Sequence, residues 1–134
     1  EIVTQAGPQA VRGEATPNLA IPDNNPTGVS STIGIAQAGS VGQLKVSVDI
    51  THTYIGDLRL ELVSPASRRV VLHAQLGGNQ DNLVTTYDSA APLSPLSALV
   101  GQSMQGDWVL RVADLAAVDV GTLNRWSLEI TPAS

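Results

Sequence analysis

The segment THTYIGDLRLELVSP, residues 51–65, contains the features that decide the fold. In its second half, LRLELV (58–63), leucine alternates with charged residues. A period of two is typical of a strand with one buried face. Residues 51–56 close a preceding strand and contain a glycine, and Pro65, which has no N–H for a ladder, ends the second strand. The segment therefore predicts two strands joined at a tight hairpin corner.

The same alternation recurs along the chain, for example in Leu44, Val46, Val48 and Ile50. No window of a dozen residues keeps the i, i+3, i+4, i+7 spacing of an amphipathic helix. Strands are predicted near 17–21, 31–37, 42–53, 57–64, 69–75, 83–88, 107–114 and 122–131. Eight strands without a helix predict an all-β fold, a two-sheet sandwich or a jelly roll. The apolar segment 91–101 is expected to cover an open end of the sandwich, with one helical turn near 96–99.

Length and composition exclude several classes of protein. The 134 residues fit one domain, and 43% hydrophobic against 14% charged residues indicate a globular chain. The net charge of −5 argues against a nucleic-acid partner. No apolar run approaches the ~20 residues of a membrane-spanning helix, so no membrane partner is expected. The absence of cysteine excludes a disulfide framework and a thiolate site.

The beginning of the chain predicts its organisation. Residues 1–18 have scattered Gly, Pro, Thr and Gln with no period, which predicts a linker or N-terminal arm. Residues 19–134 are then the folded domain. The first residue is Glu1 rather than Met, and no signal-peptide pattern follows. We therefore expect the chain to be a piece of a longer protein.

His52 and Asp57 are close in sequence, so a catalytic pair has to be weighed. A catalytic triad needs a nucleophile on a sharp elbow, a base within bonding reach and an orienting acid. The chain has no Gly-x-Ser-x-Gly motif, and neither His52 nor His73 has metal-ligand spacing to another His or Cys. We therefore expect no catalytic residue. In the structural interpretation, Gly56 supplies a turn conformation that a β-carbon would make costly, Asp57 organises the corner, and His52 is a hydrogen-bonded structural residue.

Trp108 and Trp126 lie on apolar faces of the last two predicted strands, beside aliphatic residues. This pattern predicts core positions. The alternative is a platform on which sugars stack. Such platforms usually expose several aromatic side chains, whereas this chain has four aromatic residues in all, the other two being Tyr54 and Tyr87.

Three segments in order, THTYIGDLRLELVSP, GDWVLRVAD and DVGTLNRWSLEI, resemble the P domain (P/Homo B domain) of proprotein convertases. The family pattern of Gly-Asp-Leu, Ser-Pro, Gly-x-Trp-x-Leu and Gly-x-Leu-x-x-Trp-x-Leu matches from Gly56, Ser64, Gly106 and Gly121 respectively. The segment IPDNNPTGVSSTI (21–33) also looks like the opening of bacterial members. The resemblance covers about residues 19–131 and marks His52, Gly56, Asp57, Trp108, Gly121 and Trp126 as motif residues.

The resemblance implies an eight-stranded jelly roll placed C-terminal to a secreted, subtilisin-like serine protease domain, or sometimes to another secreted hydrolase. The catalytic triad would belong to that neighbour, which is the implied partner within the parent chain. The P domain would be a non-catalytic accessory domain that supports folding and stability of the catalytic domain and shapes substrate access. One departure is Ile55 where some convertases have the Arg of Arg-Gly-Asp, so integrin-type recognition is not carried over. The lack of cysteine and of N-glycosylation signals suits a bacterial exported protein.

Calcium is the one cofactor that the carboxylates of this sequence suggest. Six to eight oxygen ligands are needed, and no EF-hand loop is present. The candidate ligands are Asp23, Asp81, Asp88, Asp114 and Asp119. Asp114 and Asp119 flank one loop and could converge on an ion. In the alternative interpretation, these carboxylates organise turns.

Four arginines form a further candidate surface. Arg59 and Arg111 are expected on outward faces, and Arg68 and Arg69 in a turn, where they could pair with Glu61 and Glu129 or meet an acidic patch on a catalytic neighbour. Two other functions stay open: a module that binds a protein or carbohydrate substrate for a secreted hydrolase, and an enzyme that uses His52.

Overall fold

Strands make up nearly all the regular structure of the computed structural model, which describes residues 10–118 and 120–133. The strands are β1 (Val11–Ala15), β2 (Leu19–Ile21), β3 (Asn25–Ile35), β4 (Val41–His52), β5 (Leu58–Val63), β6 (Arg69–Ala74), β7 (Leu83–Asp88), β8 (Gly106–Asp114) and β9 (Gly121–Pro132). Two short 3₁₀ turns are η1 (Ile55–Asp57) and η2 (Pro95–Leu99). Within the described residues, no helix has the length and apolar character needed to cross a membrane.

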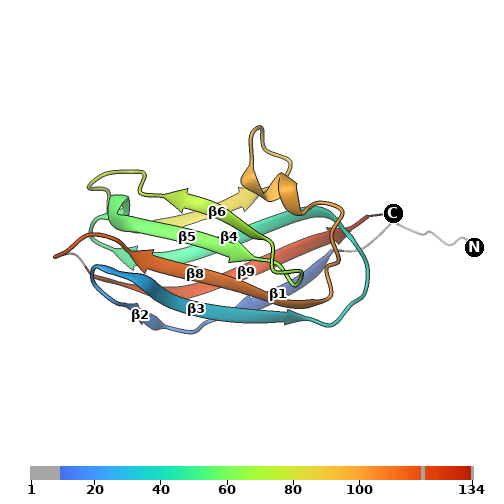
Figure 1. Ribbon diagram of the computed structural model, residues 1–134, viewed down its shortest axis with the longest axis horizontal. Coiled ribbons are helices and arrows are strands. Elements are labelled where there is room, and N and C mark those ends of the chain that lie inside the picture. Colours follow the sequence, from blue (N-terminus) through green and yellow to red (C-terminus); the bar gives the residue numbers. More distant parts are fainter. Residues whose placement is uncertain (1–9, 119, 134) are drawn as a thin grey trace, which may run out of the picture.

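Two antiparallel sheets lie face to face (Figure 1). One has the strand order β1-β9-β4-β7, with β2 also paired to β9, and the other has the order β3-β8-β5-β6. The second sheet is nearer the viewer in Figure 1. The predicted all-β sandwich is confirmed. The strand orders support the jelly-roll connectivity, which stays a prediction.

β1 lies within the segment that the sequence predicts as a linker or N-terminal arm. It pairs with β9 in a regular antiparallel ladder, and β2 continues along the same strand. β1 and β2 thus form one interrupted edge strand, which adds a ninth strand but leaves eight strand positions. The alternation is weak here because one inward residue is Gly13, whose close approach to Ile33 leaves no room for a side chain. Residues 1–9 lie outside the described residues.

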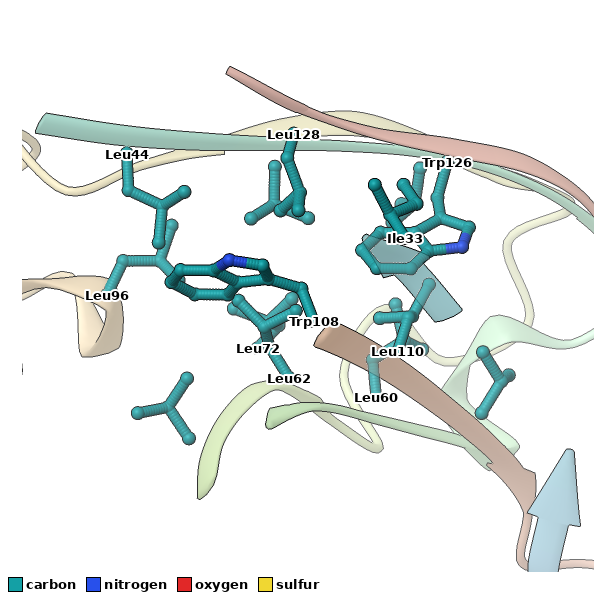
Figure 2. Packing of buried hydrophobic residues seen from close by; sticks show 14 of the residues in the cluster. Ile33, Leu44, Leu60, Leu62, Leu72, Leu96, Trp108, Leu110, Trp126 and Leu128 are labelled. Carbon is teal, nitrogen blue, oxygen red and sulfur yellow. The ribbon is translucent and has the colours of Figure 1, made fainter. Parts of the chain in front are cut away.

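The core fills the space between the sheets. The inward residues of β4 and β5 are buried as the alternation predicts. Trp108 and Trp126 project between the sheets, each surrounded by aliphatic side chains (Figure 2). Both indoles also satisfy their N–H groups internally: Trp108 Nε1 donates to Met104 O at 3.0 Å, and Trp126 Nε1 donates to Ser31 Oγ at 2.8 Å. The prediction of two core tryptophans is confirmed.

Residues 91–101 cover one part of this core, as predicted. The segment contains the turn η2, whose Ser94 side chain accepts a hydrogen bond from Leu96 N. Leu96 and Leu99 are fully buried, and η2 packs on β6.

Candidate functional site

The corner at residues 51–58 carries the chain from one sheet to the other. β4 pairs with β7 and β9, whereas β5 pairs with β6 and β8. The predicted hairpin is therefore wrong, because the two strands that flank the corner never pair with each other. A strand, a short turn and a second strand have the same sequence pattern in a hairpin and in a crossing between sheets, so the pattern alone does not separate them.

His52 lies at the centre of this corner and is fully buried. Its Nδ1 accepts a hydrogen bond from Tyr54 N at 3.0 Å, so the neutral ring carries its proton on Nε2. Nε2 then donates to Asp114 Oδ2 at 3.0 Å. Both ring nitrogens thus have hydrogen-bond partners. The predicted hydrogen bonding of His52 is confirmed, and its purely structural role stays a prediction.

The partner of His52 is Asp114 rather than the neighbouring Asp57. His52 continues the inward positions of β4, and Asp114 continues the inward positions of β8, so the two side chains meet across the sandwich. In the sequence, a polar residue at an inward position of an alternating strand indicates that His52 and Asp114 are each buried. The pairing itself, between residues 62 apart, needs the arrangement of the sheets.

Two motif glycines make room for the corner. A Cβ on Gly121 would lie 2.6 Å from His52 Cδ2 and would also clash with Thr51 O. A Cβ on Gly56 would lie 2.9 Å from Gly78 Cα and 2.9 Å from Gly78 O. Gly56 is not among the described residues with positive φ, so the predicted conformational reason is wrong. Glycine is needed there because the backbone of Gly78 passes close by and accepts a hydrogen bond from Gly56 N at 2.9 Å.

The second histidine also supports this corner. His73 is buried on β6, and its Nε2 lies 3.0 Å from Ile55 O, which accepts the hydrogen bond. Asp57 is buried too, and its backbone oxygen accepts a hydrogen bond from Leu115 N at 2.8 Å. The organising role of the Asp57 side chain stays a prediction. Residues from both sheets therefore converge on this corner, His52 and Gly121 from one sheet and His73 and Asp114 from the other.

Four of the five predicted calcium ligands lie in the described part of the chain, and no three of these four form a group that could hold a metal ion. Asp114 Oδ1 accepts a hydrogen bond from Ala116 N while Oδ2 binds His52, so both its oxygens are occupied. Asp23 accepts a hydrogen bond from Val118 N, and Asp81 is exposed in the β6–β7 loop.

A hydrogen bond from Ala90 N lowers the pKa of the half-buried Asp88 carboxyl, whose Oδ1 also lies 3.4 Å from Gln43 Nε2. Asp119 lies outside the described residues. Among residues 10–118 and 120–133, no three His, Asp or Glu side chains form a group that could hold a metal ion.

A cluster of charged side chains covers the outer face of the β3-β8-β5-β6 sheet. Glu61 is 5% exposed although it points outward, because three arginines surround its carboxylate. Its distances to Arg59, Arg111 and Arg69 are 3.0, 3.4 and 3.8 Å. The predicted pairing of arginines with Glu61 is confirmed, whereas Glu129 pairs with Arg12 at 3.5 Å.

Arg111 also donates hydrogen bonds to the backbone at the irregular start of β3. Its Nε donates to Thr27 O at 3.0 Å, and its Nη2 donates to Pro26 O at 2.9 Å. Beside it lies a cavity of about 210 Å³, lined by Pro26, Arg59, Glu61, Arg111, Ala113 and Leu115. The outer face of the other sheet has a trough of about 310 Å³ lined mainly by small polar side chains, where Ser47 Oγ lies 2.8 Å from Thr86 Oγ1.

The comparisons with known proteins agree with this geometry. The chain is 40% identical over 102 residues to a calcium-dependent protease of Trichormus variabilis, which covers 74% of this chain and 15% of the relative. It is 37% identical over 118 residues to a transglutaminase-activating metalloprotease of Streptomyces mobaraensis, covering 86% of this chain and 14% of the relative. The chain therefore spans about a seventh of these curated relatives.

A solved structure has the same fold. The Aeromonas sobria serine protease, in complex with the chaperone ORF2, matches with a TM-score of 0.72 and 25% identity over 98% of this chain and 28% of that chain. The family model described as "Proprotein convertase P-domain" matches residues 41–130, which include the His52 corner, both tryptophans and Glu61. The chain belongs to the proprotein convertase P-domain family.

Proposed function

We propose that this P domain is a non-catalytic accessory unit of a larger, secreted bacterial protease, in which it supports the folding and stability of the catalytic domain. The observation that supports this most directly is the occupation of both His52 nitrogens by Tyr54 N and Asp114. A general base needs a free nitrogen within bonding reach of the proton that it removes. The second histidine, His73, is buried against the backbone of the same corner.

The proposed partner is the catalytic domain of the same parent chain. The relatives are named as proteases, and most of each relative lies outside the matched region. A subtilisin-like serine protease is our first choice for the parent, supported by the Aeromonas sobria serine protease. The Streptomyces mobaraensis relative is named a metalloprotease, so the reaction class of the parent is a separate question from the role of this domain.

Heat inactivation of the parent protease tests the stabilising role. The intact parent and a parent lacking residues 1–134 are incubated at increasing temperature, and residual activity is measured on a small soluble substrate. A shorter half-life for the truncated protein, with equal initial turnover, is expected if the domain stabilises its neighbour. Equal half-lives would refute the stabilising role.

A second candidate function is the binding of a protein substrate. The polar trough between β4, β7 and β9 favours it, because Ser47, Thr86 and Ser127 offer hydroxyl groups beside Asp49 and Arg125. A sugar-stacking role is disfavoured because both tryptophans are buried. Retention of the parent on insoluble protein, lost on truncation at unchanged turnover of the soluble substrate, would support the substrate-binding function.

The Trichormus variabilis relative is named a calcium-dependent protease, which makes calcium a candidate cofactor of the parent. The described carboxylates do not fit a calcium site by themselves, so we derive no step through the ion. Melting of residues 1–134 in calcium and in chelator tests the hypothesis. A calcium-dependent rise in Tm that Asp23→Asn removes would place an ion near the β2–β3 turn, while equal Tm values would assign calcium dependence to the rest of the parent.

A further inference from the structure

We infer that the outer face of the β3-β8-β5-β6 sheet docks on an acidic segment of the parent's catalytic domain. This inference rests on the proposed function, because it names the surface that would hold the two domains together. We call this surface the arginine face and define it by Arg59, Glu61, Val63, Arg69, Val109 and Arg111.

The arginine face carries an excess of positive charge. Three arginines surround one glutamate, and the exposed Asp107 lies further along the same side of β8, so this face has a local charge of about +1 in a chain whose net charge is −5. The side chains of Arg59 and Arg69 remain 47% and 58% exposed although both are paired with Glu61. Their guanidinium groups therefore keep donors available for a second carboxylate, which arginine can bind bidentately.

Apolar side chains complete this surface. Val63 lies between Arg69 and Val109 in the cross-strand register, and all three are outward positions. Both valines are half-buried. In the next row, Glu61 lies between Val71 and Arg111. Arginine mixed with aliphatic residues is the composition of the buried part of many protein interfaces.

The cavity beside this surface could bind one carboxylate-bearing side chain of the partner. Arg59 and Arg111, with the Glu61 carboxylate between them, form its charged wall, while Ala113, Leu115 and Pro26 form its apolar wall. An Asp or Glu of the partner could place its carboxylate against Arg59 and its aliphatic carbons against Leu115. The volume of about 210 Å³ suits one side chain rather than a drug-sized ligand.

The outer face of the other sheet lacks this character. Its outward charged side chains are Arg12, Lys45 and Arg125 against Glu14, Asp49, Asp88 and Glu129, which leaves a local charge of about −1. Val84 is an exposed apolar residue on it. A second copy of the chain meeting the arginine face with its own arginine face would oppose like charges. Charge complementarity therefore favours an acidic segment of a different domain as the occupant.

Arginine-selective labelling with phenylglyoxal, read by mass spectrometry, tests this docking directly in the intact parent. Labelling rates of Arg59 and Arg69 are compared with those in residues 1–134 alone. Arg125 is the matched control because it is also exposed and ion-paired, at 3.4 Å from Glu14, but lies on β9 of the other sheet. We expect Arg59 and Arg69 to react at least about tenfold more slowly in the parent, the protection that about 1.4 kcal/mol of docking gives, and Arg125 to be unchanged.

Equal labelling of Arg59 and Arg69 in the parent and in the isolated chain would overturn the inference, whatever truncation does to heat inactivation. If truncation still shortened the half-life, the stabilising function would stand and docking would use another surface. Protection in the isolated chain that rises with its concentration would identify a second copy as the occupant, which also overturns the inference. Raised ionic strength should remove the protection if carboxylates cause it.

Discussion

Single polar residues in this chain hold the fold together at positions where a sequence motif invites a catalytic interpretation. His52, Asp114 and His73 are all buried, and each has its partner within the domain. The ring nitrogens of His52 join β4 to β8 and to its own corner. Burying such groups is costly unless they are paired, so each member depends on the others.

His52→Ala should therefore destabilise the isolated chain strongly. The substitution leaves the Asp114 carboxylate buried without its ring partner, which typically costs about 3–5 kcal/mol. Urea unfolding followed by tryptophan fluorescence measures the loss. Lys45→Ala, an outward position on the same strand, is the control and should change the free energy of unfolding by less than about 0.5 kcal/mol. A similarly small loss for His52→Ala would contradict the buried pair.

Tyr87 should make the stability depend on pH in alkaline solution. Burial against the core raises the pKa of its phenol from 10.0 to about 12. The unfolded chain ionises first, so the stabilising contribution is complete below the unfolded pKa and is lost as pH rises through the folded pKa. The loss of unfolding free energy between about pH 9 and pH 11 should be smaller in Tyr87→Phe than in the wild type. Equal losses in both proteins would show that Tyr87 is not the cause.

Between elements, the joint from β4 to β5 and the two indoles depend on close packing. Gly56→Ala pushes a carbon against the Gly78 backbone and should cost about 1–3 kcal/mol. Gly34→Ala is the matched control, because its nearest neighbour would be the Asp107 side chain at 3.4 Å and its φ is not positive. Thermal melting of both variants measures the difference. Equal Tm values would mean that the corner can widen without cost.

Trp126→Ala should be more damaging than the loss of its hydrogen bond. Removing the indole empties the space between the sheets seen in Figure 2 and should cost about 3–5 kcal/mol. Ser31→Ala keeps the indole and removes only the acceptor of Nε1, at about 1–3 kcal/mol. Unfolding in urea ranks the two variants. A reversed ranking would contradict the core role of Trp126.

The elements also show how far sequence reasoning extends. Alternation correctly places Leu44, Trp108 and Trp126 in the core, because a strand that buries one face repeats every two residues. It misses β1, where Gly13 replaces a large inward side chain. It also treats β4 and β5 as a hairpin, because sheet membership depends on partners far away in the sequence. The alternation likewise does not predict the burial of Glu61, because this burial arises from arginines on three strands.

At the scale of the whole molecule, the two outer faces of the sandwich differ. The face of β4 and β9 is mostly polar with a small excess of negative charge, whereas the arginine face is cationic and partly apolar. The motif residues lie inside, in the core and at the joint between sheets, and so specify the fold. Under the proposed function, the surface carries the contacts with the parent protease.

We propose that the motif residues of this domain act through stability and not through chemistry. The most direct test is turnover of a small soluble substrate by the parent protease carrying Asp114→Asn, measured at low temperature and during heating. The variant weakens the partner of His52 without removing volume. We predict unchanged turnover per folded molecule at low temperature and a shorter half-life on heating. Turnover that falls while the domain is still folded, by its tryptophan fluorescence, would contradict the account.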